Sequence, residues 1–134
     1  MLLMSFNAKR IIFFKFGRYK RALNYLRDKK PDIIGFQELN DKSLKIYTKN
    51  LSNYNVVGEG SSKNVLFREY TSIFVDKKYN IISSKTFSLT SKIDKIGYKE
   101  KEDNLPRICV LCHIRDKNKK ILVVNTHIDN TDSK

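Results

Sequence analysis

The stretch PDIIGFQE, residues 31–38, decides the fold. Its centre, residues 33–36, is a continuous apolar run of strand length, as expected for a strand that is covered on both faces. Before it comes the apolar stripe of a helix, with residues three and four positions apart: Tyr19, Ala22, Leu23 and Leu26. Pro31 ends that helix because it cannot donate the next backbone hydrogen bond. A helix followed by a doubly covered strand indicates helices packed on a sheet.

Similar signals surround this centre in the first half of the chain. We expect a short strand over residues 2–6, followed by a basic, aromatic loop over residues 9–16. Asp41 is predicted to cap a second helix, and a strand over residues 54–57 closes at the glycines of residues 58–60. The first half therefore alternates strand, helix, strand, helix, strand.

From Tyr70 onward the pattern changes to hairpins. Two are predicted: residues 71–75 with 79–86, and residues 108–114 with 121–125. The polar connection between them, residues 91–104, is either a mobile loop or part of a binding rim. We therefore predict a single domain over residues 1–134, of class α/β (α+β), with a mixed β-sheet and helices on one outer face.

The chain is strongly basic, with 27 Lys and Arg against 14 Asp and Glu and a net charge of +13. Such a field attracts phosphate-bearing or other anionic partners. The lysines are spread along the chain instead of forming one block, so a surface that only keeps the protein soluble is the alternative.

Neither a targeting segment nor a reactive cysteine pair is expected. The N-terminal MLLM has no cationic lead and is too short for a signal peptide, and no later run approaches a membrane span, so we expect a cytoplasmic protein. Cys109 and Cys112 form a C-x-x-C, but residues three apart on a strand point to opposite faces. We therefore expect buried thiols that neither form a disulfide nor share a metal.

Polar residues appear where three of the predicted strands end. Asn7 follows the first apolar run, Gln37 and Glu38 follow the second, and Asn125 and His127 follow the last. In α/β sheets ligands collect at such ends. Taken singly, each residue is also typical of a turn, a helix cap or a solvated surface.

Six blocks of the sequence carry a family resemblance together. In chain order they are SFN (5–7), PDIIGFQE (31–38), REYTSIF (68–74), TFSL (86–89), PRIC (106–109) and NTHID (125–129). In this order and with these separations they resemble the endonuclease/exonuclease/phosphatase superfamily, over residues 4–130. The pairing of the QE block with the NTHID block is the most specific part.

The resemblance implies a metal-dependent hydrolase of phosphate esters with a deoxyribonuclease I-like fold, in which two mixed sheets pack face to face with helices outside. In that family the counterpart of Glu38 binds Mg²⁺ or Mn²⁺, which suits a hard ion that prefers oxygen ligands. The counterpart of Asn7 helps to place metal and phosphate. The counterpart of His127 hydrogen-bonds or protonates the phosphate, and a histidine titrates in the range that this role needs.

Three more residues are implied to bind substrate: Arg68, Asn125 and Asp129. The planar fork of an arginine suits a substrate phosphate. A solvated surface position is the alternative for Arg68, and Asp129 could instead orient a partner.

The resemblance stops at the middle of the family's domain. The later Gly-Asp-x-Asn and Ser-Asp-His blocks of the family, the second of which supplies the general base, are not present in the 134 residues. We therefore expect half of a four-layer sandwich, without its second sheet and with its inner apolar face exposed. Either a homodimer or a complementing chain then covers that face, or the sequence corresponds to a poorly folded fragment or to a truncated gene without an independent role.

Two hypotheses of function follow. The first is a divalent-metal-dependent hydrolase of phosphate esters, either a phosphodiesterase or nuclease or a phosphatase, which is inactive or incomplete as this chain alone. The alternative is a non-catalytic basic half-domain that binds nucleic acid or another anion, or that pairs with a complementing chain. Salt-sensitive binding to nucleic acid without hydrolysis favours the alternative. The sequence does not choose between nucleic acid, lipid and sugar or inositol phosphates as the substrate.

Overall fold

The computed structural model of the chain describes residues 1–10, 16–101 and 103–128. Its elements, in chain order, are β1 (Leu3–Asn7), α1 (Phe16–Lys29), β2 (Ile33–Gln37), α2 (Asp41–Asn50), β3 (Tyr54–Val57), β4 (Ile73–Asp76), β5 (Asn80–Ser88), β6 (Ile108–Asp116) and β7 (Lys119–Thr126). None of the helices in these ranges is long and apolar enough to cross a bilayer.

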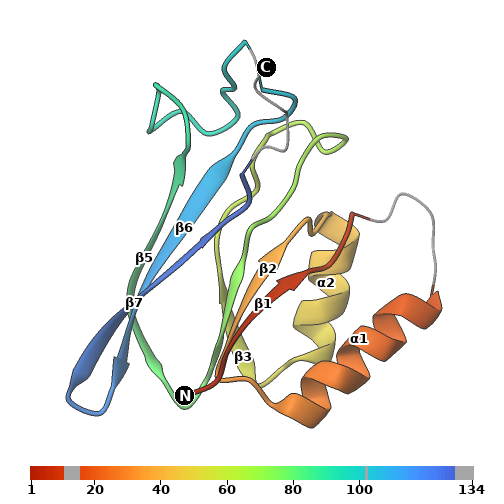
Figure 1. Cartoon of the computed structure of the whole chain (residues 1–134), viewed down its shortest axis with the longest axis vertical. Helices are drawn as coiled ribbons and strands as arrows, with labels where there is room; N and C mark the ends of the chain where they lie inside the picture. Colours follow the sequence, from red (N-terminus) through yellow and green to blue (C-terminus); the bar gives the residue numbers. More distant parts are fainter. Residues whose placement is uncertain (11–15, 102, 129–134) are drawn as a thin grey trace.

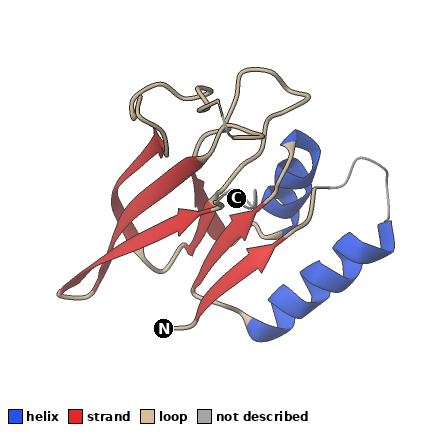
Figure 2. Ribbon diagram, turned by 45° about the horizontal axis from the view of Figure 1, so that its top comes forward, coloured by secondary structure: helices blue, strands red, loops and turns tan. Residues whose placement is uncertain are grey.

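Two sheets pack face to face, and both helices lie on the outer side of one of them (Figure 1). The four-stranded sheet has the order β1-β2-β4-β3, with β1 and β2 parallel and the other pairs antiparallel. The three-stranded sheet has the order β5-β6-β7 and is antiparallel throughout. Figure 2 shows the same three layers from a second direction. The predicted mixed sheet with helices on one outer face is therefore confirmed.

Strand β2 is covered on both faces, as its unbroken apolar run predicts, and all five of its residues are buried. Ile34 and Phe36 point toward the helices, where they pack with Tyr47 and other residues of α1 and α2. Ile33 points the other way and packs against Val110 and other residues of β6. Alternation of side chains along β2 thus places it in two cores at once.

Strand pairing differs from the prediction at one hairpin. Residues 71–75 and 79–86 do not form one, because β4 pairs with β2 and β3 while β5 pairs with β6. The short turn after Asp76 instead carries the chain from one sheet to the other. The second hairpin, β6 with β7, is confirmed. The cap of α2 is Asn40 instead of Asp41, since the Asn40 side chain accepts a hydrogen bond from the Ser43 backbone N–H.

The expected loss of the second sheet is wrong. The three-stranded sheet covers the inner face of β2 and β4 within this chain, so the reason for a dimer that pairs inner faces no longer holds. What stays uncovered on that face is β1, where the side chain of Leu3 is 62% exposed. Cys109 and Cys112 are buried and free, as predicted, and burial raises the pKa of both thiols.

Candidate active site

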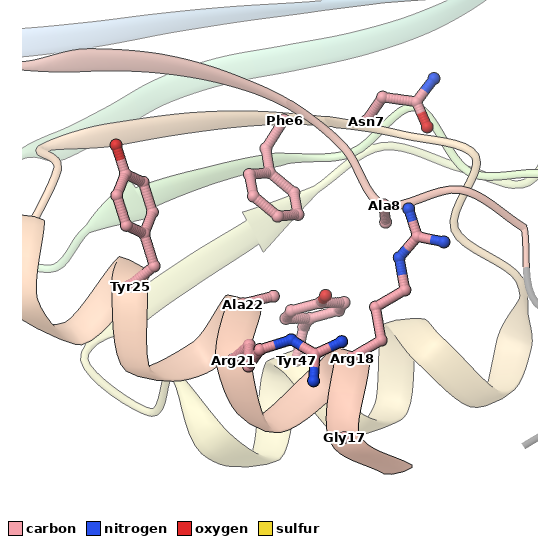
Figure 3. Close-up of a pocket in the computed structure, with 9 residues that line it drawn as sticks. All are labelled: Phe6, Asn7, Ala8, Gly17, Arg18, Arg21, Ala22, Tyr25 and Tyr47. Carbon is pink, nitrogen blue, oxygen red and sulfur yellow. The ribbon is translucent and has the colours of Figure 1, made fainter. Parts of the chain in front are cut away.

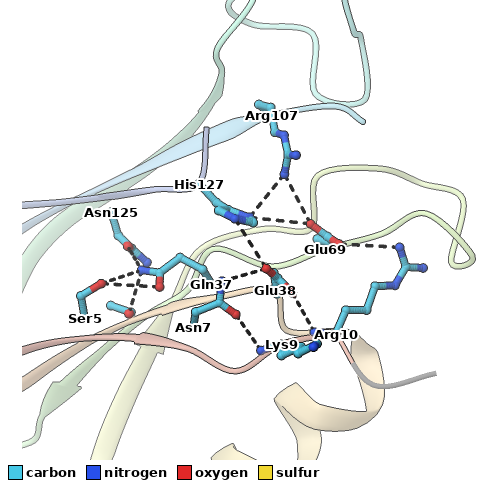
Figure 4. Close-up of polar contacts among 11 residues, drawn as sticks. Ser5, Asn7, Lys9, Arg10, Gln37, Glu38, Glu69, Arg107, Asn125 and His127 are labelled. Atoms are coloured by element: carbon cyan, nitrogen blue, oxygen red, sulfur yellow. Dashed lines mark hydrogen bonds and ion pairs between the residues drawn. The ribbon is translucent and has the colours of Figure 1, made fainter. Parts of the chain in front are cut away.

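The site begins where β1 and β2 end. These strands run parallel, so their carboxyl ends meet at one edge of the four-stranded sheet, and Asn7 pairs in register with Gln37. Glu38, directly after β2, has a φ of 57°, and Lys9, just after β1, has a φ of 52°. For a residue with a Cβ this left-handed conformation is unfavourable. Both strands therefore end in a strained bend, and the bend at Glu38 brings its carboxylate beside the end of β7 (Figure 4).

Two hydrogen bonds hold the Glu38 carboxylate. The Asn7 side-chain amide donates to Oε1 at 2.7 Å, and the Arg10 backbone N–H donates to Oε2 at 3.0 Å. Asn7 is itself fixed, because its Oδ1 accepts from the Lys9 backbone N–H at 2.7 Å. Burial acts to raise the pKa of Glu38, but these hydrogen bonds and the positive charges of His127 and Lys9 outweigh it and lower the pKa. Glu38 is therefore ionised at neutral pH.

His127 follows β7 and lies between two carboxylates (Figure 4). Its Nε2 is 3.7 Å from Oε1 of Glu38, and its Nδ1 is 4.0 Å from Oε2 of Glu69. Nδ1 is also 3.3 Å from Nη1 of Arg107. The His127 side chain is 28% exposed, so a ligand can reach it from solvent. Glu38 and His127, 89 positions apart in the sequence, thus share one edge of the fold with Asn7.

Three charged residues of this edge were not singled out from the sequence: Arg10, Glu69 and Arg107. Glu69 is the centre of the group, with Oε1 3.7 Å from Nη1 of Arg10 and Oε2 3.6 Å from Nη1 of Arg107. Arg107 comes directly before β6, which is antiparallel to β7, so the start of β6 lies beside the end of β7. This antiparallel pairing is the signal that could have predicted the contact between Arg107 and His127.

Arg68 does not join this cluster. Its Nε and Nη2 donate to the backbone carbonyls of Ser62 at 2.7 Å and Lys63 at 2.6 Å, and its Nη1 lies 3.1 Å from Oδ1 of Asp41. The structure thus ties Arg68 to its own loop and to the start of α2, while the next residue, Glu69, is the one that contacts His127. Asp129 lies outside the described residues.

Asn125 is buried and joins the two sheets. Its Nδ2 donates to the backbone carbonyls of Phe36 at 2.9 Å and Ser72 at 3.1 Å, and its Oδ1 accepts from Nε2 of Gln37 at 2.8 Å. It faces Gly35, where a Cβ would come 2.9 Å from its Oδ1. Asn125 as a whole is 7% exposed, so its side chain contacts the protein interior. This arrangement holds the end of β7 against β2.

The oxygen donors of this edge suit a Mg²⁺ or Mn²⁺ ion that keeps several waters, and not an ion enclosed by protein ligands on all sides. Among the described residues, no three His, Cys, Asp or Glu side chains are grouped as a cage would require. Mg²⁺ keeps several waters and is commonly held by one or two carboxylates. Glu38 is ionised and its side chain is 24% exposed, so it can reach such an ion, and the Asn7 amide lies against the same carboxylate.

Comparison with known proteins places this geometry in a fold family. No family model matches the sequence. An uncharacterised protein of Acanthamoeba polyphaga mimivirus is 31% identical over 123 residues, which cover 84% of this chain and 46% of that protein. The endonuclease/exonuclease/phosphatase from Bacteroides vulgatus is 25% identical, with a TM-score of 0.85 over 93% of this chain and 51% of that one.

Two further solved structures share the fold. A mannosyl-6-phosphatase from Bacteroides thetaiotaomicron is 24% identical, with a TM-score of 0.87 over 99% of this chain and 54% of that one. D. rerio TDP2, in complex with a single-strand DNA product, is 16% identical, with a TM-score of 0.73 over 98% and 47%. The chain therefore has the endonuclease/exonuclease/phosphatase fold that its sequence resemblance implies. It spans about half the length of the proteins it matches.

Proposed function

We propose that this chain carries the metal-binding half of a divalent-metal-dependent phosphoesterase. The observation that carries the proposal is the meeting of Glu38, Asn7 and His127 at one edge of the two sheets, with hydrogen-bonded Glu38 ionised and reachable from solvent. The fold shared with phosphatases and with TDP2 supports the same class of reaction. Mg²⁺ or Mn²⁺ is the proposed cofactor.

Each residue of the site has a distinct proposed task. Glu38 is the metal ligand, and Asn7 keeps its carboxylate in place by donating to Oε1. When bound, the metal ion offsets the charge that develops on the phosphate oxygens. His127 presents an exposed imidazole beside Glu38, from which it donates a hydrogen bond or a proton to a phosphate oxygen. Arg107 and Glu69 hold the imidazole from its Nδ1 side.

The charges of the cluster also support an anionic substrate. Glu69 is neutralised by two arginines, Arg10 and Arg107, so that this carboxylate does not repel a phosphate group. The net charge of +13 adds a long-range attraction for the same partner. We assign no substrate contact to Asn125, which we propose to be a structural residue of the site, and Arg68 and Asp129 stay predictions.

Metal binding is the decisive measurement, because the chain spans about half the length of its relatives. Mn²⁺ affinity of the purified chain is measured by the loss of the free-ion electron paramagnetic resonance signal, in Glu38→Gln and in Asp28→Asn as a control on the exposed end of α1. Glu38→Gln is expected to weaken Mn²⁺ binding at least tenfold, while Asp28→Asn leaves it unchanged. Equal affinity in all three proteins would refute the proposal.

Hydrolysis is the second measurement. Bis(p-nitrophenyl) phosphate is incubated with the chain and Mg²⁺, and any turnover is expected to disappear in Glu38→Gln and with a chelator. Nucleic-acid binding that is salt-sensitive but accompanied by neither hydrolysis nor Glu38-dependent metal binding favours the non-catalytic half-domain instead.

A further inference from the structure

A cavity of about 760 Å³ adjoins the candidate active site on the helical side of β1. It lies between the end of β1 and one face of α1 (Figure 3). Its lining combines two cations, three aromatic rings and one residue of the site: Arg18 and Arg21, Phe6, Tyr25 and Tyr47, and Asn7. None of the roles proposed above uses this cavity.

Two like charges converge on it. Arg18 and Arg21 are one turn apart on α1, and their guanidinium groups both line the cavity (Figure 3). Like charges at this spacing repel one another. Among the described residues neither has an acidic partner within ion-pair distance, in contrast to Arg10 and Arg107, which share Glu69. A bound phosphate would relieve the repulsion, and the planar guanidinium group of an arginine can donate two hydrogen bonds to the same phosphate.

The rest of the lining is flat and apolar. Tyr47 is 1% exposed and forms part of the floor, whereas Tyr25 is 50% exposed at one side and Phe6 is partly buried opposite α1. Exposed aromatic rings beside cationic groups are the usual platform for the bases of single-stranded nucleic acids, because every base can stack. A simple sugar phosphate would leave this surface without a partner.

The cavity and the candidate active site share one residue, Asn7. Asn7 lines the cavity and also donates to the Glu38 carboxylate at 2.7 Å. A ligand that bound both places would therefore have a phosphate at Glu38 and His127 and a second phosphate, with a base, along α1. That pattern of repeated phosphates and flat bases is the chemistry of a polynucleotide strand.

We propose that this cavity binds the nucleotide next to the phosphate held at Glu38 and His127, which makes single-stranded nucleic acid the substrate class. The phosphate of that nucleotide lies between Arg18 and Arg21, and its base packs against Tyr25 and Phe6. The inference rests on the proposed function for the reaction, but the cavity is tested here through binding alone.

The experiment measures fluorescence anisotropy of a labelled six-nucleotide oligothymidylate in EDTA, so that neither metal nor turnover contributes. The variant Arg18→Gln/Arg21→Gln is compared with Lys20→Gln/Lys45→Gln, which removes two exposed positive charges outside the cavity. The arginine pair is expected to cost at least tenfold in affinity and to reduce the slope of log K against log salt by about 0.7 for one lost phosphate contact. The lysine pair is expected to cost less than threefold.

A second comparison isolates the base. Tyr25→Ala is expected to weaken binding of oligothymidylate at least fivefold but to leave binding of an abasic strand of the same length unchanged. Circular dichroism establishes that each variant is folded.

Equal losses in the two charge pairs, or a Tyr25→Ala effect of equal size on both strands, would overturn the proposal. Thymidine monophosphate bound as tightly as the six-nucleotide strand would overturn it as well, since the ligand would then be a mononucleotide. Because these measurements exclude metal, they stay informative if Glu38→Gln has no effect on Mn²⁺ binding, and the two proposals fail separately.

Discussion

Replacing Asn125 tests how much the stability of the fold depends on one buried amide that joins the two sheets. In Asn125→Ala the carbonyl of Phe36 and the carbonyl of Ser72 each lose a hydrogen bond from Nδ2, and Nε2 of Gln37 loses an acceptor. The loss at Gln37 is the smallest, because its Nε2 also donates to the Gly35 carbonyl at 3.0 Å. The Ser72 carbonyl likewise keeps the backbone N–H of Phe36 at 2.8 Å.

The expected cost follows from those partners. Each net hydrogen bond is worth about 1 kcal/mol, and a buried acceptor that stays unpaired costs roughly 1–3 kcal/mol. The Phe36 carbonyl is left without this partner, whereas the Ser72 carbonyl and Nε2 of Gln37 each keep another one. Together these losses give about 3 kcal/mol for Asn125→Ala, out of a total stability of about 5–15 kcal/mol. Val124→Ala, at an adjacent β7 residue that is 55% exposed, is expected to change stability by no more than about 0.5 kcal/mol.

Urea unfolding followed by far-ultraviolet circular dichroism measures the difference, which suits a chain without tryptophan. With a slope of about 1.5 kcal/mol/M, the midpoint of Asn125→Ala is expected to fall by about 2 M. Asn125→Asp is the more specific test, because aspartate has nearly the same size as asparagine. It replaces the NH₂ group that donates to two carbonyl oxygens with an oxygen that can only accept. It is expected to be less stable than Asn125→Ala at pH 7.

The pH dependence of Asn125→Asp has a fixed sign. Carbonyl oxygens around a carboxylate raise its pKa in the folded state. The carboxylate therefore destabilises the fold most at a pH well above that pKa, and this effect decreases as the pH falls and the carboxyl group is protonated. Relative to the unmodified chain at each pH, the variant should therefore recover stability as the pH falls through that raised pKa. A midpoint for Asn125→Ala within roughly 0.5 M of that of the unmodified chain, which is the resolution of such a measurement, would refute the reasoning. An aspartate variant as stable as the alanine variant would refute it as well.

Three other perturbations give direct tests. The hydrogen bond from Lys78 lowers the pKa of Asp32 to about 2 against the opposing effect of burial. This carboxylate therefore adds at most about 2 kcal/mol to the free energy of unfolding, reduced by the exposure of Lys78, and that stability is present above about pH 4 and lost toward pH 2. In Asp32→Asn the urea midpoint should not fall over this pH range for that reason. Gly58→Ala places a Cβ at a φ of 112° and 3.1 Å from Cγ2 of Val110, and is expected to lower the free energy of unfolding by at least about 1 kcal/mol in the same assay. Glu38→Gly relieves the strain of a left-handed φ but removes two hydrogen bonds, so the free energy of unfolding should change by less than about 1 kcal/mol. Calorimetry of the same variant is expected to detect no Mn²⁺ binding.

The local elements were predictable because their signals are local. The apolar run of residues 33–36 and the spacing of apolar residues in α1 gave the doubly covered strand and the helix beside it. The partner of β4 was not predictable from such signals. A turn of Asp76, Lys77 and Lys78 fits a hairpin, but it fits equally well a connection that leaves one sheet and enters another, and only the packing of both sheets decides between them.

The site shows the same division between local and long-range information. Asn7, Glu38 and His127 stand where apolar runs stop, so the sequence could predict that they meet. Arg68 was preferred to Glu69 as a site residue, yet Glu69 is the one that contacts Arg10, Arg107 and His127. Successive residues of an extended chain point in opposite directions. Which of two neighbours faces the site depends on register, here the bridges of Tyr70 with Leu39 and Gly60, and register was not visible in the sequence.

Backbone strain gives an argument for the site that does not depend on any resemblance. Among the described residues with a side chain, four have a positive φ: Lys9, Lys30, Glu38 and Lys117. Lys30 follows the end of α1 and Lys117 lies in the β6–β7 turn, where a left-handed residue is ordinary. Lys9 and Glu38 instead follow adjacent parallel strands, and each conformation costs about 1–2 kcal/mol relative to glycine. A glycine at position 38 would remove the strain and the carboxylate together. The chain nevertheless has glutamate at this position, as expected if the chemistry of the site requires the carboxylate.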